Sequence, residues 1–265
     1  MKPYKLGLAL SGGGARGIAH VGVLQALEDH GYRPDILSGT SAGAVAAVLY
    51  AAGYSPVEML SFVKQASLFK LFKVGLPYAG LTKHTYLRQQ LEELIEEDSF
   101  EALKIPLHVA MSCLNTGTLE VRSSGPLYDA ITASSAIPLI FQPTEIDGKL
   151  YVDGGLLENL PVASIRDQAD FVIGVNVMPT SQVDKKAIQH VFGIAQRCFD
   201  LSILANTQPS LDLCDLTVEP TEVRNYTILQ LSKYQQLYDI GYRAMTEQMD
   251  TLKELLQKKD TASGS

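Results

Sequence analysis

Hydrophobic residues follow two alternating patterns along the chain, short apolar runs and longer stripes at helical spacing. A run at 4–10 ends at a cluster of glycines and predicts a buried strand. The stripe that begins at Ile18 predicts a helix ending before Gly31, and a short strand at 34–38 leads directly into an apolar helix at 42–52. Strands and helices that alternate through short connections imply a mainly parallel sheet covered by helices.

The rest of the chain continues this alternation, with two hairpin signals at Asn115-Thr116-Gly117 and Asp147-Gly148. We therefore expect one α/β domain over residues 1–257, with a mainly parallel central sheet sandwiched by helices, and a disordered tail at 258–265. Further strands are predicted at 106–114, 118–122, 145–146, 150–152, 171–177 and 213–219, and further helices at 84–97, 126–136, 187–204 and 232–257.

Composition narrows the class of protein. Of 265 residues, 46% are hydrophobic and 19% are charged, which is typical of a globular chain and excludes disorder as its main state. The net charge of −7 argues against nucleic-acid binding. The three cysteines are far apart and form no cluster with histidine, so we expect no metal site, no cofactor and no disulfide framework. The apolar runs are too short for a membrane span or a signal peptide, and we expect a cytoplasmic protein.

A glycine-rich loop, Gly12-Gly13-Gly14-Ala15-Arg16-Gly17, lies between the first predicted strand and helix. Glycines let a ligand approach the backbone N–H groups, and the helix N-terminus adds a partial positive charge. Such a loop serves a phosphate or a developing oxyanion. A dinucleotide site would also need an acidic residue at the end of the second strand. The nearest acid, Asp35, stands at the start of that strand instead, which weakens the dinucleotide interpretation.

A second motif, Gly39-Thr40-Ser41-Ala42-Gly43, joins a predicted strand to an apolar helix. A nucleophilic serine on a sharp strand-to-helix turn needs small neighbours such as Gly39 and Gly43, so this motif predicts Ser41 as the nucleophile. A third motif, Asp153-Gly154-Gly155, follows a short strand. A partly desolvated Asp153 beside the serine hydroxyl would have a raised pKa and could accept its proton. The alternative for this third motif is a turn without a chemical role.

A histidine base would be the more usual partner of a serine. Of the five histidines, only His190 follows a plausible acidic motif, and it stands near the start of a predicted helix, where a packing or surface role is favoured. The α/β-hydrolase order also requires several strands before the nucleophile, whereas Ser41 follows the second strand.

Together these motifs resemble the patatin-like phospholipase family. The resemblance includes the segment Ala133-Ser134-Ser135-Ala136-Ile137-Pro138 with Phe141 and Pro143, and Asn159-Leu160-Pro161 after the aspartate. It covers nearly the first two-thirds of the chain and implies a three-layer α/β/α fold like that of patatin. The resemblance further implies a Ser41–Asp153 dyad that cleaves carboxylic esters of lipids without a metal, as in phospholipases A, lysophospholipases and esterases.

In the expected reaction, Ser41 attacks an ester carbonyl, Asp153 takes its proton, and the backbone N–H groups of Gly12 to Ala15 stabilise the oxyanion. Arg16 either holds this loop or faces a lipid phosphate, and the holding role is favoured. A regulatory binding module on the same fold is the alternative function. The expected partner is a lipid or acyl-ester substrate, and the oligomeric state is left open.

Peripheral contact with a membrane surface also stays open, with the segment 58–73 as a candidate lipid-facing flap. Met59, Phe62 and Val63 share one helical face and are expected to pack on the domain. Leu71 and Phe72 fall off that stripe, among interspersed lysines. The alternative is a second packing face within the domain.

Overall fold

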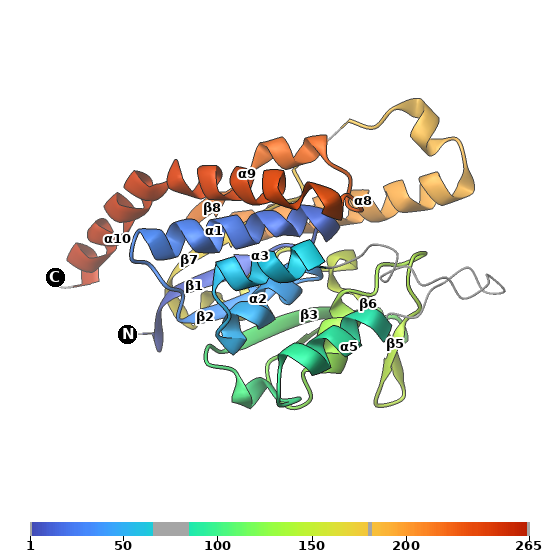
Figure 1. Cartoon of the computed structure of the whole chain (residues 1–265), viewed down its shortest axis with the longest axis horizontal. Helices are drawn as coiled ribbons and strands as arrows, with labels where there is room; N and C mark the ends of the chain where they lie inside the picture. The colour runs from blue at the N-terminus through green and yellow to red at the C-terminus, as the bar shows by residue number, and fades with distance from the viewer. Residues whose placement is uncertain (1, 66–84, 180–181, 264–265) are drawn as a thin grey trace.

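The computed structural model describes residues 2–65, 85–179 and 182–263. Within these ranges, eight strands form one mixed sheet in the order β5-β6-β3-β2-β1-β7-β8, with β4 paired to β3 (Figure 1). The pairs that β1 forms with β2 and β7 are parallel, as are β2 with β3 and β7 with β8. The strands are β1 (Tyr4–Leu10), β2 (Ile36–Gly39), β3 (Leu107–Cys113), β4 (Thr118–Arg122), β5 (Thr144–Ile146), β6 (Lys149–Asp153), β7 (Ala169–Val175) and β8 (Leu216–Val218).

Helices cover both faces of this sheet, so the predicted α/β class with a mainly parallel sheet is confirmed. Both predicted hairpins are present, as β3 with β4 and β5 with β6. No helix in the described part of the chain is long and apolar enough to cross a bilayer. The helices are α1 (Ile18–Asp29), α2 (Ala42–Ala52), α3 (Pro56–Gln65), α5 (Thr85–Leu94), α6 (Tyr128–Ser134), α7 (Ala163–Arg166), α8 (Val191–Leu211), α9 (Tyr234–Thr246) and α10 (Met249–Ser263).

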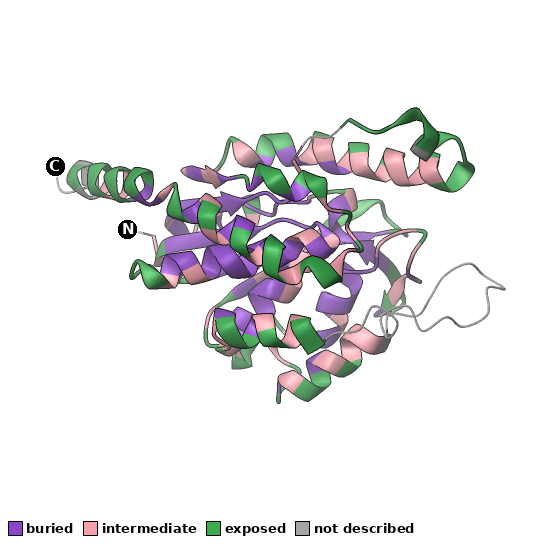
Figure 2. Ribbon diagram, turned by 45° about the horizontal axis from the view of Figure 1, so that its top comes forward, coloured by how far each residue is buried: buried purple, intermediate pink, exposed green. Residues whose placement is uncertain are grey.

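The core has two parts because successive side chains of a strand point to opposite faces of the sheet. Leu8 and Ile173 belong to the larger cluster, which α1, α2 and α9 cover. Ala9 and Val172, one position away, belong to a smaller cluster with Ile165 of α7. Figure 2 shows buried residues concentrated in the sheet and on the helix faces that meet it, while α10 is mostly exposed.

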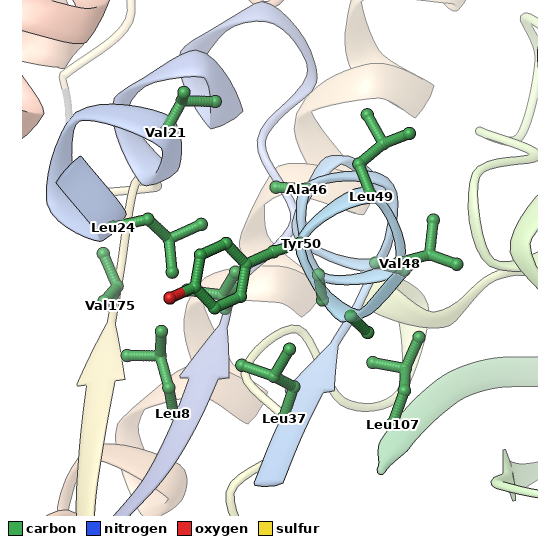
Figure 3. Close-up of a cluster of buried hydrophobic side chains, with 14 of the residues drawn as sticks. Leu8, Val21, Leu24, Leu37, Ala46, Val48, Leu49, Tyr50, Leu107 and Val175 are labelled. Carbon is green, nitrogen blue, oxygen red and sulfur yellow. The ribbon is translucent and has the colours of Figure 1, made fainter. Parts of the chain in front are cut away.

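The larger cluster joins the first two helices to the sheet (Figure 3). Leu24 of α1 and Val48 of α2 are fully buried, with Leu24 on the side of Leu8 and Val48 above Leu107 of β3. Tyr50 completes this layer, with its hydroxyl donating to the Glu28 carboxylate at 2.9 Å. The segment before the Ser41 turn and the helix after it are therefore held rigidly against the sheet.

Strands β2 and β6 pair with the same edge of β3, one after the other along its length. Val109 pairs with Gly39 of β2 and with Arg122 of β4, so β2 and β4 lie on opposite edges of β3. Met111 pairs with β4 as well and, on the other edge, with Asp153 of β6. The carboxyl ends of β2 and β6 therefore face each other along the same edge. The chain after Gly39 and the end of β6 are about two residues apart along that edge, roughly 7 Å.

The C-terminal region differs from the prediction in two ways. The single helix expected at 232–257 is two helices, α9 and α10, separated at 247–248. The sequence has no glycine or proline there, so periodicity alone could not locate the break. The tail expected from 258 is helical through Ser263, because no helix breaker precedes Gly264 and Lys259 is anchored. The Lys259 ammonium donates to Asp215 at 2.7 Å and lies 5.4 Å from the centre of the Phe171 ring.

Helices α1 and α9 approach each other through two glycines. A Cβ at Gly22 would overlap the carbonyl oxygen of Tyr238, and a Cβ at Gly241 would overlap that of Ala19. Both neighbours are backbone atoms, which cannot move aside as a flexible side chain can. The backbones therefore pack directly against each other.

We predict that Gly241→Ala lowers the free energy of unfolding by about 1–3 kcal/mol, the usual cost of overpacking a core. Helix propensity alone predicts the opposite sign, a gain of up to about 1 kcal/mol. Urea denaturation of both proteins measures the difference, and a stabilised variant would contradict the close packing of α1 and α9.

Candidate active site

Ser41 occupies the sharp turn between β2 and α2. Its backbone has φ 54° and ψ −122°, a conformation that costs a non-glycine residue on the order of 1–3 kcal/mol. The turn can form because Gly43 has no Cβ, which would overlap the carbonyl oxygen of Leu10. The Ser41 side chain is 5% exposed. The motif therefore holds a hydroxyl in a fixed, strained position at the carboxyl end of the sheet.

Asp153 ends β6 and lies beside Ser41, where the shared edge of β3 brings it. The residue is 3% exposed, and burial raises the pKa of its carboxyl to about 7. A hydrogen bond with the Ser41 hydroxyl and another from the Gly155 N–H, at 2.8 Å to Oδ1, lower this pKa in part. Near neutral pH the carboxyl is thus poised between its two protonation states, as a general base must be.

The end of α6 and the residues that follow it hold both Ser41 and Asp153. The Ser134 hydroxyl accepts a hydrogen bond from the Ser41 N–H at 2.9 Å. Two residues later, the carbonyl of Ala136 accepts the Asp153 N–H at 3.0 Å. In the sequence, this segment is part of the family resemblance and has no assigned role. Its physical role is to fix the backbones of Ser41 and Asp153 with respect to each other.

In the glycine loop, two of the four backbone N–H groups from Gly12 to Ala15 are hydrogen-bonded within the protein. The Gly12 N–H donates to the Asn159 carbonyl at 3.1 Å, and the Ala15 N–H donates to the Ile228 carbonyl at 2.8 Å. In the described part of the chain, no group accepts from the N–H of Gly13 or Gly14. Of the four backbone N–H groups from Gly12 to Ala15 that are expected to face a substrate, those of Gly13 and Gly14 are therefore the two that remain free among the described residues.

Arg16 and a distant segment keep the loop in shape. The Arg16 Nε donates to the carbonyl of Tyr226 at 2.8 Å, and burial lowers the pKa of the guanidinium. The Ile228 carbonyl, which accepts from Ala15, would lie 2.5 Å from a Cβ at Gly14. The holding role favoured for Arg16 agrees with these contacts. Residues 226–228 gave no signal in the sequence, because their contribution is made by backbone carbonyls.

Two cavities meet at Ser41. The larger, of about 270 Å³, is almost wholly apolar and follows α2 from Ser41 past Val45 to Leu49. Side chains of α1, α3 and α5 form its other walls, among them Val21, Met59, Leu91 and Leu94. The smaller, of about 20 Å³, lies on the side of α8 and is lined by Gly12–Gly14, Ser41, Asp153, Asn159, Gln196 and Asp200, with apolar neighbours. A large apolar cavity and a small cavity that reaches the carboxyl of Asp153 thus flank one hydroxyl.

The other predicted residues fall into three groups. Gly39, Gly154 and Gly155 lie in the turns that carry Ser41 and Asp153, and a Cβ at Gly154 would overlap the carbonyl oxygen of Ala110. His190 precedes α8 as an exposed residue and lines neither cavity. Asp35 accepts the N–H groups of Lys5 and Leu6 at the far end of the sheet. Among the described residues, no group of three or more metal-ligating side chains could hold an ion.

The candidate flap at 58–73 is described only as far as Gln65. Met59 is buried, and Phe62 and Val63 pack partly against the core, as expected for the docking face. Leu71 and Phe72, the candidate lipid-facing residues of the flap, lie outside the described residues.

The model of the patatin-like phospholipase family matches residues 8–165. An uncharacterized NTE family protein of Mycobacterium tuberculosis is 36% identical over 177 residues, which cover 65% of this chain and 49% of that protein. Lysophospholipase NTE1 of Saccharomyces cerevisiae is 30% identical over 167 residues, covering 61% of this chain and 10% of that protein. The chain spans about half the length of its mycobacterial relatives and a small part of the yeast one.

Solved structures resemble the chain in fold alone. VipD from Legionella pneumophila gives a TM-score of 0.54 at 16% sequence identity, over 89% of this chain and 67% of that one. Human GIVD cytosolic phospholipase A2 also gives 0.54, at 10% identity, over 97% of this chain and 60% of that one.

Because the pKa of Asp153 is raised in the folded protein, we expect the stability of the fold to depend on pH. The unfolded carboxyl titrates near its ordinary pKa of about 4, and the folded one near about 7. Between these values the folded state holds a proton that the unfolded state has lost, so stability falls as the pH rises through this window. Asp153→Asn removes this loss. The variant should melt above the unaltered protein at about pH 8, with the difference shrinking towards pH 4. A difference that is constant with pH would contradict the raised pKa.

Proposed function

The chain belongs to the patatin-like phospholipase family, and we propose that it hydrolyses carboxylic esters of lipids through a Ser41–Asp153 dyad. The observation that carries the proposal is the position of the Ser41 hydroxyl. It is strained, hydrogen-bonded to a buried carboxyl and open to an apolar cavity on one side. Lysophospholipase and phospholipase A2 among the similar proteins support a lipid ester as the substrate class.

The reaction would begin with acylation of the serine. The Ser41 Oγ attacks the ester carbonyl carbon while the Asp153 carboxylate accepts the hydroxyl proton. The N–H groups of Gly13 and Gly14 donate to the oxyanion of the tetrahedral intermediate, an interaction worth on the order of 3 kcal/mol per donor in known sites. The bond to the leaving alcohol then breaks, and that alcohol takes the proton from Asp153. Water repeats the sequence on the acyl-enzyme and releases a fatty acid.

The apolar cavity fits the acyl chain of such a substrate. From Ser41 to Leu49, α2 advances roughly 12 Å at 1.5 Å per residue. An extended carbon chain with bonds of about 1.5 Å advances roughly 1.3 Å per bond, so this length takes an acyl chain of about ten carbons. Each buried methylene contributes about 0.8 kcal/mol. The site is therefore proposed to take medium-length chains.

A binding module without turnover is the alternative, and a dinucleotide site is disfavoured. A scaffold would need the glycines for packing but would have no use for a strained serine beside a buried carboxyl. Asp35, the acid nearest to a ribose-binding position, is already satisfied by two backbone N–H groups. Release of p-nitrophenol from a medium-chain p-nitrophenyl ester separates an enzyme from a module.

We expect an active-site-directed fluorophosphonate to modify Ser41 alone, and Ser41→Ala to abolish both the labelling and the hydrolysis. Asp153→Asn should lower kcat roughly 10³-fold or more, because the serine loses its base, while circular dichroism stays unchanged. His190→Ala is the matched control and should leave the rate within about twofold, since an exposed side chain away from both cavities has no partner in the reaction. Labelling that persists in Ser41→Ala would exclude the assigned nucleophile.

Contact with a membrane surface is also part of the proposed function, and we place it at the beginning of α8. Val191 is 85% exposed, and Phe192 and Ile194 are about half exposed. Lys185 and Lys186 precede them in a stretch whose single acidic residue is Asp184, in a chain of net charge −7. Exposed apolar residues beside lysines suit an anionic bilayer surface. One turn or more further along, α8 contributes Gln196 and Asp200 to the smaller cavity, so a lipid bound at this surface would be near Ser41.

Val191→Ser with Phe192→Ser should weaken binding to vesicles of phosphatidylglycerol and phosphatidylcholine about tenfold or more, because two apolar side chains no longer enter the bilayer. Vesicle sedimentation in a Ser41→Ala background measures binding without hydrolysis. Val57→Ser removes an apolar residue of α3 that is 67% exposed, and it should leave binding unchanged. Equal losses in both variants, or a change of oligomeric state instead of binding, would contradict this surface.

A further inference from the structure

Asn159 carries the one side-chain amide lining the smaller cavity that has no partner within the described protein, and it lies among the proposed reacting groups. The residue is 1% exposed, and neither its Oδ1 nor its Nδ2 has a hydrogen-bond partner. Buried polar groups are nearly always hydrogen-bonded, since an unmade bond is costly in the interior. A buried amide without a protein partner, beside Ser41 and Asp153, points to a partner that arrives during the reaction.

The backbone fixes the position of this amide. The Asn159 N–H donates to the Oδ1 of Asn206 at 2.9 Å, and its carbonyl accepts the Gly12 N–H at 3.1 Å. The Asn206 Nδ2 donates in turn to the carbonyl of Gly155 at 2.9 Å. Asn206 of α8 therefore holds the whole turn from Gly155 to Asn159. These three bonds fix the backbone of Asn159, and with it the direction of its Cα–Cβ bond, without using its side-chain amide.

Two glycines leave room for the amide. A Cβ at Gly12 would lie 2.6 Å from the Asn159 Oδ1, and a Cβ at Gly155 would lie 3.1 Å from it. Gly12 precedes the two free N–H donors, and Gly155 binds the Asp153 carboxylate. The amide carbonyl thus stands between the oxyanion loop and the base.

The cavity beside it has the size of one water molecule. Its volume is about 20 Å³, and a site needs on the order of 10–15 Å³ and two to four polar partners to hold a water. Ser41, Asp153 and Asn159 all line it. The acyl chain has the separate apolar cavity on the other side of Ser41, so a water here would not compete with it.

We infer that Asn159 positions the hydrolytic water of the second half-reaction; the inference rests on the function proposed above. The water donates one hydrogen to the Asp153 carboxylate and the other to the Asn159 Oδ1, which leaves a lone pair directed at the acyl carbon. Its oxygen bonds to that carbon while Asp153 takes the first proton. The bond from the carbon to the Ser41 Oγ then breaks, and Oγ takes the proton from Asp153 as the fatty acid leaves. Acylation uses no water and does not need Asn159.

Two variants separate the half-reactions. Asn159→Leu replaces the amide by an apolar group of similar shape, and Asn159→Ala leaves space if leucine does not fit. Stopped-flow mixing with p-nitrophenyl octanoate gives acylation as the burst and deacylation as the steady rate. Both variants should deacylate about tenfold more slowly, the effect of one lost hydrogen bond in the transition state. Acylation should stay within about threefold, and intact-mass spectrometry should find an octanoyl group on Ser41.

Ser38→Ala is the matched control. Ser38 is also fully buried with an unpartnered hydroxyl, but it lines neither cavity. This variant should keep the ratio of deacylation to acylation of the unaltered protein.

The outcomes distinguish this inference from the proposed function. Unchanged deacylation in both Asn159 variants, or an equal fall in both half-reactions, would overturn the water-positioning role. The first result would make Asn159 structural, and the second would make it a third oxyanion donor. Absence of any hydrolysis by the unaltered protein would instead overturn the lipid ester hydrolase itself.

Discussion

Strand β3 pairs with β2 and β6 along one edge, with their carboxyl ends facing, and the geometry of the candidate site follows from this pairing. Gly39 lies opposite Val109, and Asp153 lies opposite Met111. The turn that follows Gly39 carries Ser41, so a hydroxyl and a carboxyl that are 112 positions apart meet at the same point of the sheet. The bonds from Ser134 and Ala136 then fix the two backbones. Neither residue needs a flexible loop to reach the other.

Burial determines the chemistry of the point where Ser41 and Asp153 meet. An aspartate in water is too weak a base to take a serine proton, but the enclosed Asp153 has a pKa of about 7. The same enclosure separates a large apolar cavity, suited to a hydrocarbon chain, from a small cavity beside the carboxyl. Stability and chemistry therefore oppose each other at Asp153 and at the strained Ser41, as is usual where a fold retains a functional group at a cost.

The last third of the chain completes a site that the first two-thirds only outline. Carbonyls of Tyr226 and Ile228 hold Arg16 and Ala15, and Asn206 holds the turn from Gly155 to Asn159. These contacts leave the N–H groups of Gly13 and Gly14 as the free donors of the glycine loop. The family match ends at residue 165, so the holding contacts come from a region in which the sequence resemblance is weak.

The sequence by itself determined the local elements and the residues that carry chemistry. Apolar periodicity identified the sheet and most helices, and small residues around Ser41 and Asp153 marked both turns, because turns and repeats depend on neighbours in the chain. The tertiary structure decided the features that depend on residues far apart in the chain. These are the approach of Ser41 to Asp153, the two of four loop N–H groups that stay free, and the continuation of α10 through the expected tail. It also gave Asn159 its place, since an unpartnered amide is recognisable only when everything packed around it is known. Burial and hydrogen bonding between remote segments have no signature in local spacing, and for that reason the fold alone could supply them.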